Sequence, residues 1–207
     1  PGAIYNSNRY VLRGLLEAMQ TWAAGNHYPL PSEIDYHNDA VSDLGNAKNT
    51  TANILSLLIF HGLISPDMCI SPAESNPRIV RAEDYQFANP KYAVHPNAAL
   101  WDPAFTCDFS QATGVANNSY AHLLPAGGRK VFWSDTGSPD ESIIGNRGPL
   151  VASINRDTRS IPAIRWANAE SYTFLIHGGP RTWEGYIAYN DGHVGFETSA
   201  SPSSVRY

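Results

Sequence analysis

The stretch that decides the fold lies near the C-terminus and reads Tyr186-Ile187-Ala188-Tyr189-Asn190-Asp191-Gly192-His193-Val194-Gly195-Phe196. Asp-Gly between two alternating runs is the strongest short-range signal for a hairpin with a two-residue type I′ turn. Such a turn pairs Tyr189 with Val194 and Ile187 with Phe196. Because side chains alternate along a strand, one face would then be apolar and the other polar. The apolar face would carry Ile187, Tyr189, Val194 and Phe196, and the polar face Tyr186, Ala188, Asn190, His193 and Glu197. The stretch therefore predicts the edge of an antiparallel sheet that covers a core on one side.

Two amphipathic helices are predicted in the first third of the chain. The first runs from about Ile4 to Gly25, because its apolar residues recur at spacings of three and four. These residues are Val11, Leu12, Leu15, Leu16, Met19, Trp22 and Ala23. The second helix is predicted from Thr51 to Leu63, with Gly62 near its end. A helix with a single apolar face is suited to lying across a sheet.

The rest of the chain predicts loops followed by strands. Between Ser65 and Ser110, repeated X-Pro pairs push the preceding residues out of helical geometry, so we expect long irregular loops there. Long ordered loops often serve recognition, which makes this region the expected contact surface. Short strands are predicted at 119–124, 130–134, 150–154 and 172–176, before the hairpin. Helices first and strands later, without alternation, predict an α+β fold with an antiparallel sheet.

Composition excludes some functions. The chain has 207 residues, a net charge of −5 and 16% charged residues, and it contains no run of Lys and Arg. Phosphate binding requires clustered basic residues, so no nucleic-acid partner is expected. The longest apolar stretch, Ile54 to Ile64, is shorter than the roughly 20 residues that a membrane-spanning helix needs.

Cys69 and Cys107 are the only cysteines, so a metal cage built from thiolates alone is excluded. One intrachain disulfide between them would close a loop of about 40 residues and would stabilise the fold by roughly 3 to 4 kcal/mol. Two buried free thiols are the alternative, and the sequence leaves both open.

Two chemical interpretations compete with a purely structural one. His177, Asp191 and His193 carry the imidazole and carboxylate ligands of a transition-metal site, as in a metal-dependent hydrolase. The backbone requirements of a turn explain Asp191-Gly192 equally well. The aromatic residues Trp101 and Trp183, with Glu184 nearby, would suit a secreted carbohydrate-binding or adhesive module. Loop aromatics are at least as often packing anchors.

The motif His177-Gly178-Gly179, followed by a strand and Asp191-Gly192-His193-Val194, resembles the C-terminal signature of bacterial prepilin-like proteins named for an H-X9-DG pattern, relatives of the major pseudopilin of type II secretion. Four earlier segments resemble the same family in the same order. They are Asn26-His27-Tyr28-Pro29, Met68-Cys69-Ile70-Ser71-Pro72, Asn118-Ser119-Tyr120-Ala121 and Ile143-Ile144-Gly145-Asn146-Arg147. Thirteen residues, rather than nine, separate His177 from Asp191, which places about four inserted residues in 180–185. This insertion could move His177 away from the hairpin.

The resemblance implies a pilin-like fold with residues 1–25 as the exposed part of an N-terminal helix and residues 26–207 as a globular head. It implies a non-enzymatic structural subunit of a pilus or type II secretion pseudopilus, whose partners are other pilin-like subunits. A hydrophobic helix preceding residue 1 would pack in the filament core and provide the only membrane contact. The head would lie in the cell envelope, on the periplasmic or extracellular side, and the full-length form would be anchored in the cytoplasmic membrane before assembly.

The resemblance also implies roles for the motif residues. Asp191 and Gly192 would form the turn, and His177 and His193 would make hydrogen bonds that fix the C-terminal strands. No cofactor is expected, although related pseudopilins carry calcium near their C-terminal hairpins.

Overall fold

The computed structural model describes residues 2–24, 26–35, 44–108, 114–155, 163–168, 170–179 and 181–205. Its helices are α1 (Gly2–Ala23) and α2 (Thr51–Phe60). Its strands are β1 (Tyr120–His122), β2 (Ser142–Asn146), β3 (Val151–Asn155), β4 (Ala163–Trp166), β5 (Gly185–Tyr189) and β6 (Val194–Glu197). One antiparallel sheet has the order β1-β2-β5-β6, and β3 and β4 form a separate two-stranded ribbon. The predicted α+β class, with an N-terminal helix on an antiparallel sheet, is confirmed.

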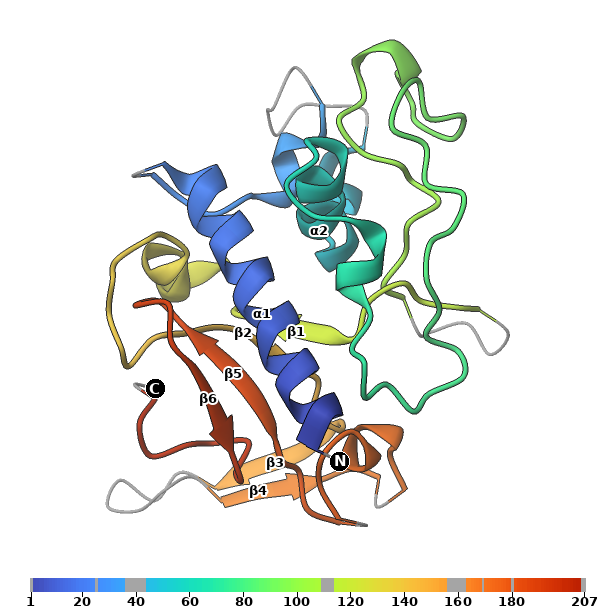
Figure 1. The fold of residues 1–207 in the computed structure, drawn as a ribbon. Helices are drawn as coiled ribbons and strands as arrows, with labels where there is room; N and C mark the ends of the chain where they lie inside the picture. The colour runs from blue at the N-terminus through green and yellow to red at the C-terminus, as the bar shows by residue number, and fades with distance from the viewer. Residues whose placement is uncertain are drawn as a thin grey trace.

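Helix α1 lies across one face of the four-stranded sheet (Figure 1). Leu12, Leu15, Leu16 and Met19 form its fully buried stripe, and the main hydrophobic core lies between this stripe, α2 and the sheet. The helix ends at Ala23, and Ala24 takes a left-handed φ of 40°. The predicted stop, Gly25, lies outside the described residues. Neither described α-helix combines the length and the hydropathy that a bilayer-spanning segment needs.

Local sequence explains both ends of α2. The Thr50 hydroxyl accepts a hydrogen bond from the Asn53 amide at 3.3 Å, which caps the first turn. At the other end, the Leu63 amide donates to the Leu58 carbonyl and the Gly62 amide donates to the Ile59 carbonyl, both at 2.9 Å. Gly62 has a φ of 71°, so this is a Schellman motif. The helix therefore ends three residues before the predicted Leu63.

The C-terminal hairpin exists, but its predicted register is wrong. Tyr186 pairs with Phe196 and Ala188 pairs with Val194, which shifts the pairing by one residue. Residues 190–192 form a three-residue loop, because the Tyr189 amide bonds to the His193 carbonyl and Gly192 alone takes a positive φ, 92°. A shift of one residue reverses the faces of β5 relative to β6. Tyr186 and Ala188, predicted on the polar face, therefore join the core beneath α1, beside Val194 from the predicted apolar face.

Two predicted strands are 3₁₀ helices instead, and two strands were missed. Residues 127–132 and 172–175 form 3₁₀ turns, where strands were predicted at 130–134 and 172–176. The Ser171 hydroxyl accepts the Thr173 amide, a local bond that competes with strand pairing. The indole of Trp133 is instead buried and donates to the Pro29 carbonyl at 3.0 Å. The missed strands are β2 and β4.

The irregular region between 65 and 108 is pinned to the molecule by a second apolar cluster and a polar network. The cluster consists of Ile34, Leu57, Ala93, Ala99 and Trp101. In the network, the Asp102 amide donates to Ser56 Oγ at 3.2 Å, Ser56 Oγ lies 2.6 Å from the Tyr85 hydroxyl, and that hydroxyl donates to the Ser56 carbonyl. Burial raises the pKa of Tyr85 strongly. The predicted long loops are thus present, and they are ordered by specific contacts.

Candidate functional site

The histidine of the His-Gly-Gly motif lies beneath the strands of the hairpin. His177 follows the 3₁₀ turn Tyr172–Leu175 and is 7% exposed. Its ring centroid lies 4.5 Å from that of Tyr5 in α1, 5.4 Å from that of Tyr186 and 5.9 Å from that of Phe196. The expectation that the inserted residues could move His177 away from the hairpin is therefore not met. The histidine instead joins the first turns of α1 to β5 and β6.

Asn8 is the centre of a buried hydrogen-bond network around this histidine. It is 0% exposed and makes four side-chain contacts with residues from distant parts of the chain. Its Nδ2 lies 3.0 Å from Asn146 Oδ1 and 2.6 Å from His177 Nε2. Its Oδ1 accepts from the hydroxyls of Ser71 at 3.2 Å and Tyr120 at 3.0 Å. We call Asn8, Ser71, Tyr120, Asn146 and His177 the Asn8 network; it joins α1, β1, β2, the segment after residue 69 and the His-Gly-Gly motif.

The hydrogen-bond directions in the network fix the protonation of His177. The Tyr186 amide, which can only donate, bonds to Asn146 Oδ1 at 2.8 Å. Asn146 therefore presents an acceptor to Asn8, and Asn8 must present Nδ2 to both Asn146 and His177. Consequently His177 Nε2 is the acceptor and its proton sits on Nδ1. Burial lowers the pKa of His177, in agreement with a neutral ring.

Three buried polar atoms near the network have no hydrogen-bond partner among the described residues: His177 Nδ1, Asn146 Nδ2 and Ser119 Oγ. Buried groups of this kind are usually satisfied by ordered water. The adjacent Arg147 forms a partly buried ion pair in which its Nη2 lies 3.1 and 3.0 Å from the two carboxylate oxygens of Glu74. The segment 143–147 thus contributes one network residue and one ion pair.

Gly178 is required by a close approach of the backbone. A Cβ atom at this position would lie 2.0 Å from the Thr182 carbonyl oxygen, so no other residue fits without movement of the loop. Gly179 pairs with Thr182 across a tight turn. Beyond this turn, Trp183 donates its indole N–H to the Arg147 carbonyl at 2.9 Å, which joins the loop to the residue that follows β2.

The turn residues form a separate, local unit at the other end of the hairpin. Asp191 Oδ1 accepts from the His193 amide at 3.1 Å and lies 2.5 Å from His193 Nδ1. Burial alone would raise the pKa of Asp191, but the hydrogen bonds and the charge of His193 lower it. The His193 ring stacks on Tyr189 at 4.3 Å. His193 thus packs on its own hairpin, and its side chain bonds to Asp191 of the turn.

Asn190, which the sequence did not single out, fastens the turn to the rest of the molecule. It is 0% exposed, and its Oδ1 accepts from the Tyr28 hydroxyl at 2.5 Å. Its Nδ2 donates to the Ser134 carbonyl at 2.8 Å and to the Glu141 carboxylate at 3.0 Å. Its carbonyl accepts from Gln20 in α1 at 3.3 Å. Tyr28 lies in the segment 26–29 that follows α1.

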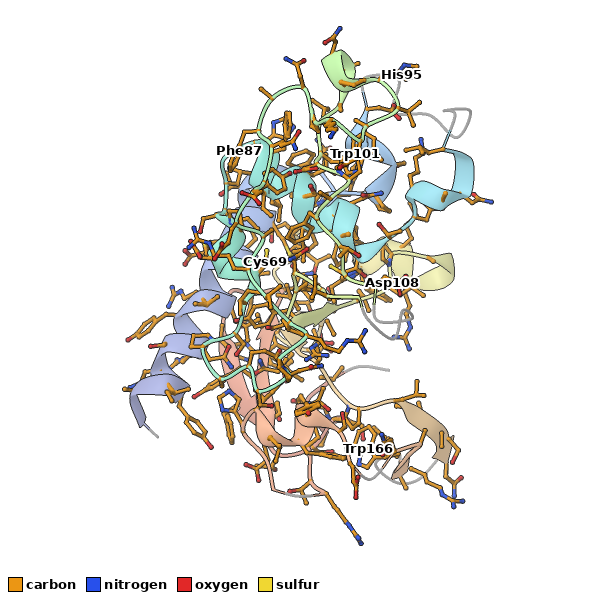
Figure 2. The ribbon with its side chains drawn as sticks, turned by 90° about the vertical axis from the view of Figure 1, so that its right-hand side faces the viewer. Cys69, Phe87, His95, Trp101, Asp108 and Trp166 are labelled. Atoms are coloured by element: carbon orange, nitrogen blue, oxygen red, sulfur yellow. The ribbon has the colours of Figure 1, made fainter. Side chains whose placement is uncertain are left out.

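The structure does not assemble the metal site considered from the sequence. His177 contacts the strands of the hairpin, whereas Asp191 and His193 contact each other at its turn. No three His, Cys, Asp or Glu side chains gather in the part of the chain that the structure describes. Trp101 and Trp183 are each only 5% exposed, so neither offers an open ring face on which a sugar could stack. Figure 2 shows Trp101 toward one end of the molecule, above Cys69.

Sequence reasoning missed Asn8, Asn146 and Asn190 as members of the site. One signal for Asn8 was present, because it lies four residues before Leu12 and so falls on the apolar stripe of α1. Asn146 and Asn190 had no comparable signal, since their partners lie far away in the sequence. A scan against protein-family models finds no match, and searches of curated proteins and of solved structures return no relative.

Proposed function

We propose that this chain is the head domain of a pilin-like or pseudopilin-like subunit, whose work is assembly. The observation that carries the proposal is the way α1 is fastened along the sheet. Its apolar stripe is buried, and two asparagine-centred hydrogen-bond sets hold it near either end, through Asn8 and through the contact of Gln20 with Asn190. A filament subunit needs such a rigid connection, because its helix packs in the filament core and has to hold the head at a fixed position relative to that core.

The outer side of α1 suits a helix that carries a head on one side only. Arg9, Arg13 and Glu17 are exposed there, and Arg13 and Glu17 form an ion pair at 2.9 Å with spacing i, i+4. Toward the N-terminus, Ile4 and Tyr10 expose 48% and 71% of their surface. In the proposed filament these apolar side chains would face neighbouring subunits.

The motif residues then have structural roles. His177 and Gly178 place a neutral ring and a close backbone contact between α1 and the hairpin, and Asp191 and Gly192 shape the turn. Asn190 holds that turn against the loop at 134–141. No step of this proposal requires a reactive group or a bound cofactor, and the partners would be other pilin-like subunits in the cell envelope.

The coding sequence upstream of residue 1 tests the proposal. It should encode a short basic leader, a small residue before the cleavage position and about 20 apolar residues. Expressed with a prepilin peptidase, the full-length protein should be cleaved and should appear in sheared surface filaments that antibodies against the head label in electron micrographs. A matched variant that lacks the apolar segment should fold but should not enter filaments. A reading frame without an apolar segment upstream would contradict the proposal.

A further inference from the structure

The two cysteines of the chain lie against the same part of the core. Cys69 ends the 3₁₀ helix Pro66–Cys69 and is fully buried in the main core, against which Cys107 packs. Figure 2 places Cys69 in the middle of the molecule. Both thiols are free in this structure.

One short segment, 117–119, holds both cysteine-bearing stretches in place. The Ser119 amide donates to the Cys69 carbonyl at 2.8 Å. The Asn117 amide donates to the Thr106 carbonyl at 2.6 Å, and the Thr106 amide donates to Asn117 Oδ1 at 3.0 Å. Asn118, in the middle of this segment, lowers the pKa of the Cys107 thiol through its side chain, against the larger effect of burial. The backbone beside Cys69 and beside Cys107 is therefore held by the same segment while both thiols are free.

The geometry brings the two cysteines together, because both pack in the same apolar cluster and segment 117–119 bonds to the backbone of Cys69 and of Thr106, the neighbour of Cys107. Burial raises the pKa of the Cys69 thiol strongly, and the adjacent Cys107 raises it further. Burial also raises the pKa of Cys107, to about 12. Each thiol is therefore a poor nucleophile at neutral pH, so exchange should be slow in the folded protein.

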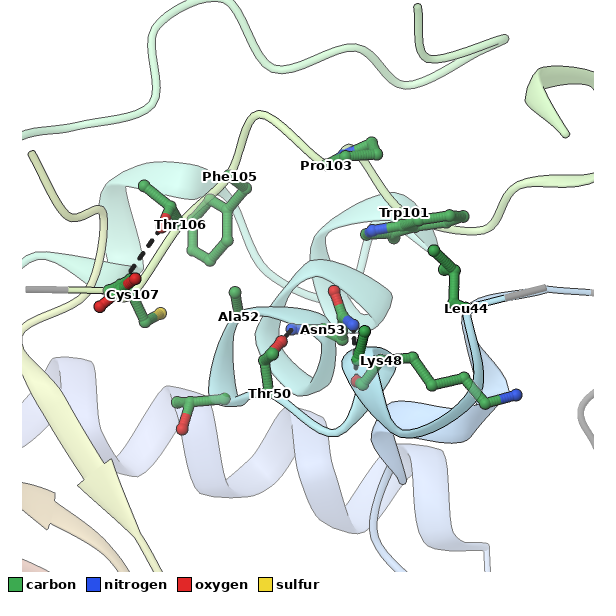
Figure 3. A pocket seen from close by; sticks show the side chains of 13 residues that line it. Leu44, Lys48, Thr50, Ala52, Asn53, Trp101, Pro103, Phe105, Thr106 and Cys107 are labelled. Atoms are coloured by element: carbon green, nitrogen blue, oxygen red, sulfur yellow. Dashed lines mark hydrogen bonds between the residues drawn. The ribbon is translucent and has the colours of Figure 1, made fainter. Parts of the chain in front are cut away.

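Only Cys107 is accessible from outside. It lines a pocket of about 380 Å³ beside Thr51, Ala52, Phe105 and Thr106 (Figure 3). A small disulfide that enters this pocket can meet the Cys107 sulfur, whereas the Cys69 sulfur is enclosed by the core.

We propose that Cys69 and Cys107 form an intrachain disulfide when the protein meets a disulfide oxidant. In the first step, the Cys107 thiolate attacks one sulfur of an external disulfide such as oxidised glutathione, forming a mixed disulfide and releasing one glutathione thiolate. In the second step, the Cys69 thiolate attacks the Cys107 sulfur and expels the other glutathione. The protein loses two electrons and two protons, and the oxidant becomes two thiols.

The bond would close a loop through the irregular region of the molecule. The helices and strands that the structure describes within residues 69–107 are few. They are the 3₁₀ turn Pro96–Ala98 and the last residue of the 3₁₀ helix Pro66–Cys69. A disulfide at this place lowers the conformational entropy of the unfolded chain and so stabilises a region that has little regular hydrogen bonding in the folded protein. Extracellular and periplasmic proteins are oxidised in this way. The inference stands independently of the proposed function, because it concerns the thiols of the purified protein alone.

An equilibrium experiment tests the inference and avoids the slow exchange of buried thiols. Reduced protein is unfolded in guanidinium chloride, refolded in mixtures of reduced and oxidised glutathione, quenched with N-ethylmaleimide and weighed by intact mass spectrometry. The wild type should refold with no alkylated cysteine and a mass about 2 Da below the reduced form. Peptide mapping should find Cys69 joined to Cys107, and the oxidised form should melt about 5–15 °C above the reduced form.

Two single variants serve as controls. Cys69→Ala should stop at a glutathione adduct on Cys107, and Cys107→Ala should retain an unmodified Cys69 once folded. Wild-type protein that refolds with two alkylatable thiols, keeps glutathione on Cys107 or forms dimers linked by disulfides would overturn the inference. An oxidised form that melts below the reduced form would do the same, because the bond would then oppose the fold.

Discussion

Replacing Asn8 with alanine tests whether the buried network holds α1 to the sheet. The substitution removes four hydrogen bonds and leaves His177 Nε2 without its partner. At a net value of about 1 kcal/mol for each bond, the loss is about 4 kcal/mol. Alanine recovers about 0.6 kcal/mol through its higher helix propensity. The free energy of unfolding should therefore fall by about 3–4 kcal/mol, a large fraction of the roughly 5–15 kcal/mol that folded proteins possess.

The chain offers a matched control two residues away. Asn6 lies on the same helix but is exposed, so Asn6→Ala gains the same helix propensity without disturbing the network. Urea denaturation followed by circular dichroism should show an unchanged slope and a much lower midpoint for Asn8→Ala, and an unchanged or slightly higher midpoint for Asn6→Ala. If Asn8→Ala costs less than about 1 kcal/mol relative to Asn6→Ala, the network does not stabilise the fold in the way we infer.

Three further predictions use the same urea assay. Gly192→Ala should destabilise the protein by about 1–2 kcal/mol, because a φ of 92° strains any residue with a Cβ although the surrounding space is open; an unchanged midpoint would argue against this turn. Gly178→Ala should cost about 3 kcal/mol or more, because its Cβ meets the Thr182 carbonyl, whereas Gly179→Ala should cost less because its Cβ meets only a rotatable side chain; the reverse order would refute the geometry. The pKa of His177 is lower in the folded protein than in the unfolded chain, so the unfolded chain binds more protons as the pH falls. The stabilisation that the neutral His177 contributes is therefore complete above about pH 6.5 and is lost below it. The free energy of unfolding should fall by at most about 1.4 kcal/mol per pH unit from this group. His177→Gln should lessen the pH dependence measured between pH 8 and pH 5, and an identical dependence in both proteins would contradict a buried neutral histidine.

The hairpin shows why its existence could be predicted from the sequence while its register could not. Asp-Gly satisfies both a two-residue turn and a three-residue loop that ends in a left-handed glycine. The choice between them depends on Asn190, which joins the loop and bonds to Tyr28, Ser134 and Glu141. Those partners lie 49 to 162 residues away in the sequence, so no local pattern contains this information. The shift then determines which strand residues reach the core.

The helices were predictable because their evidence is local. The apolar stripe of α1 and the Gly62 signal at the end of α2 depend on residues within a few positions of each other. The candidate site was not predictable in this way, because Asn8 meets residues 63 to 169 positions away. The sequence singled out His177 through the resemblance of its motif and as a candidate metal ligand with Asp191 and His193. Its actual environment, between Tyr5 and the strands of the hairpin, follows from tertiary packing.

The hydrogen bonds around Asn8 and Asn190 constrain the position of α1 more strictly than the apolar core between them does. An apolar stripe alone tolerates a shift of one helical turn, about 5.4 Å, because leucine and methionine can exchange places with modest loss. Hydrogen bonds to Asn8 and to the Asn190 carbonyl do not survive such a shift, since each donor would face no acceptor. Buried polar groups therefore fix the position of α1 along β5 and β6, in addition to stabilising the fold. For a subunit whose helix has to hold its head at a set place in a filament, this fixed position is the property that assembly requires.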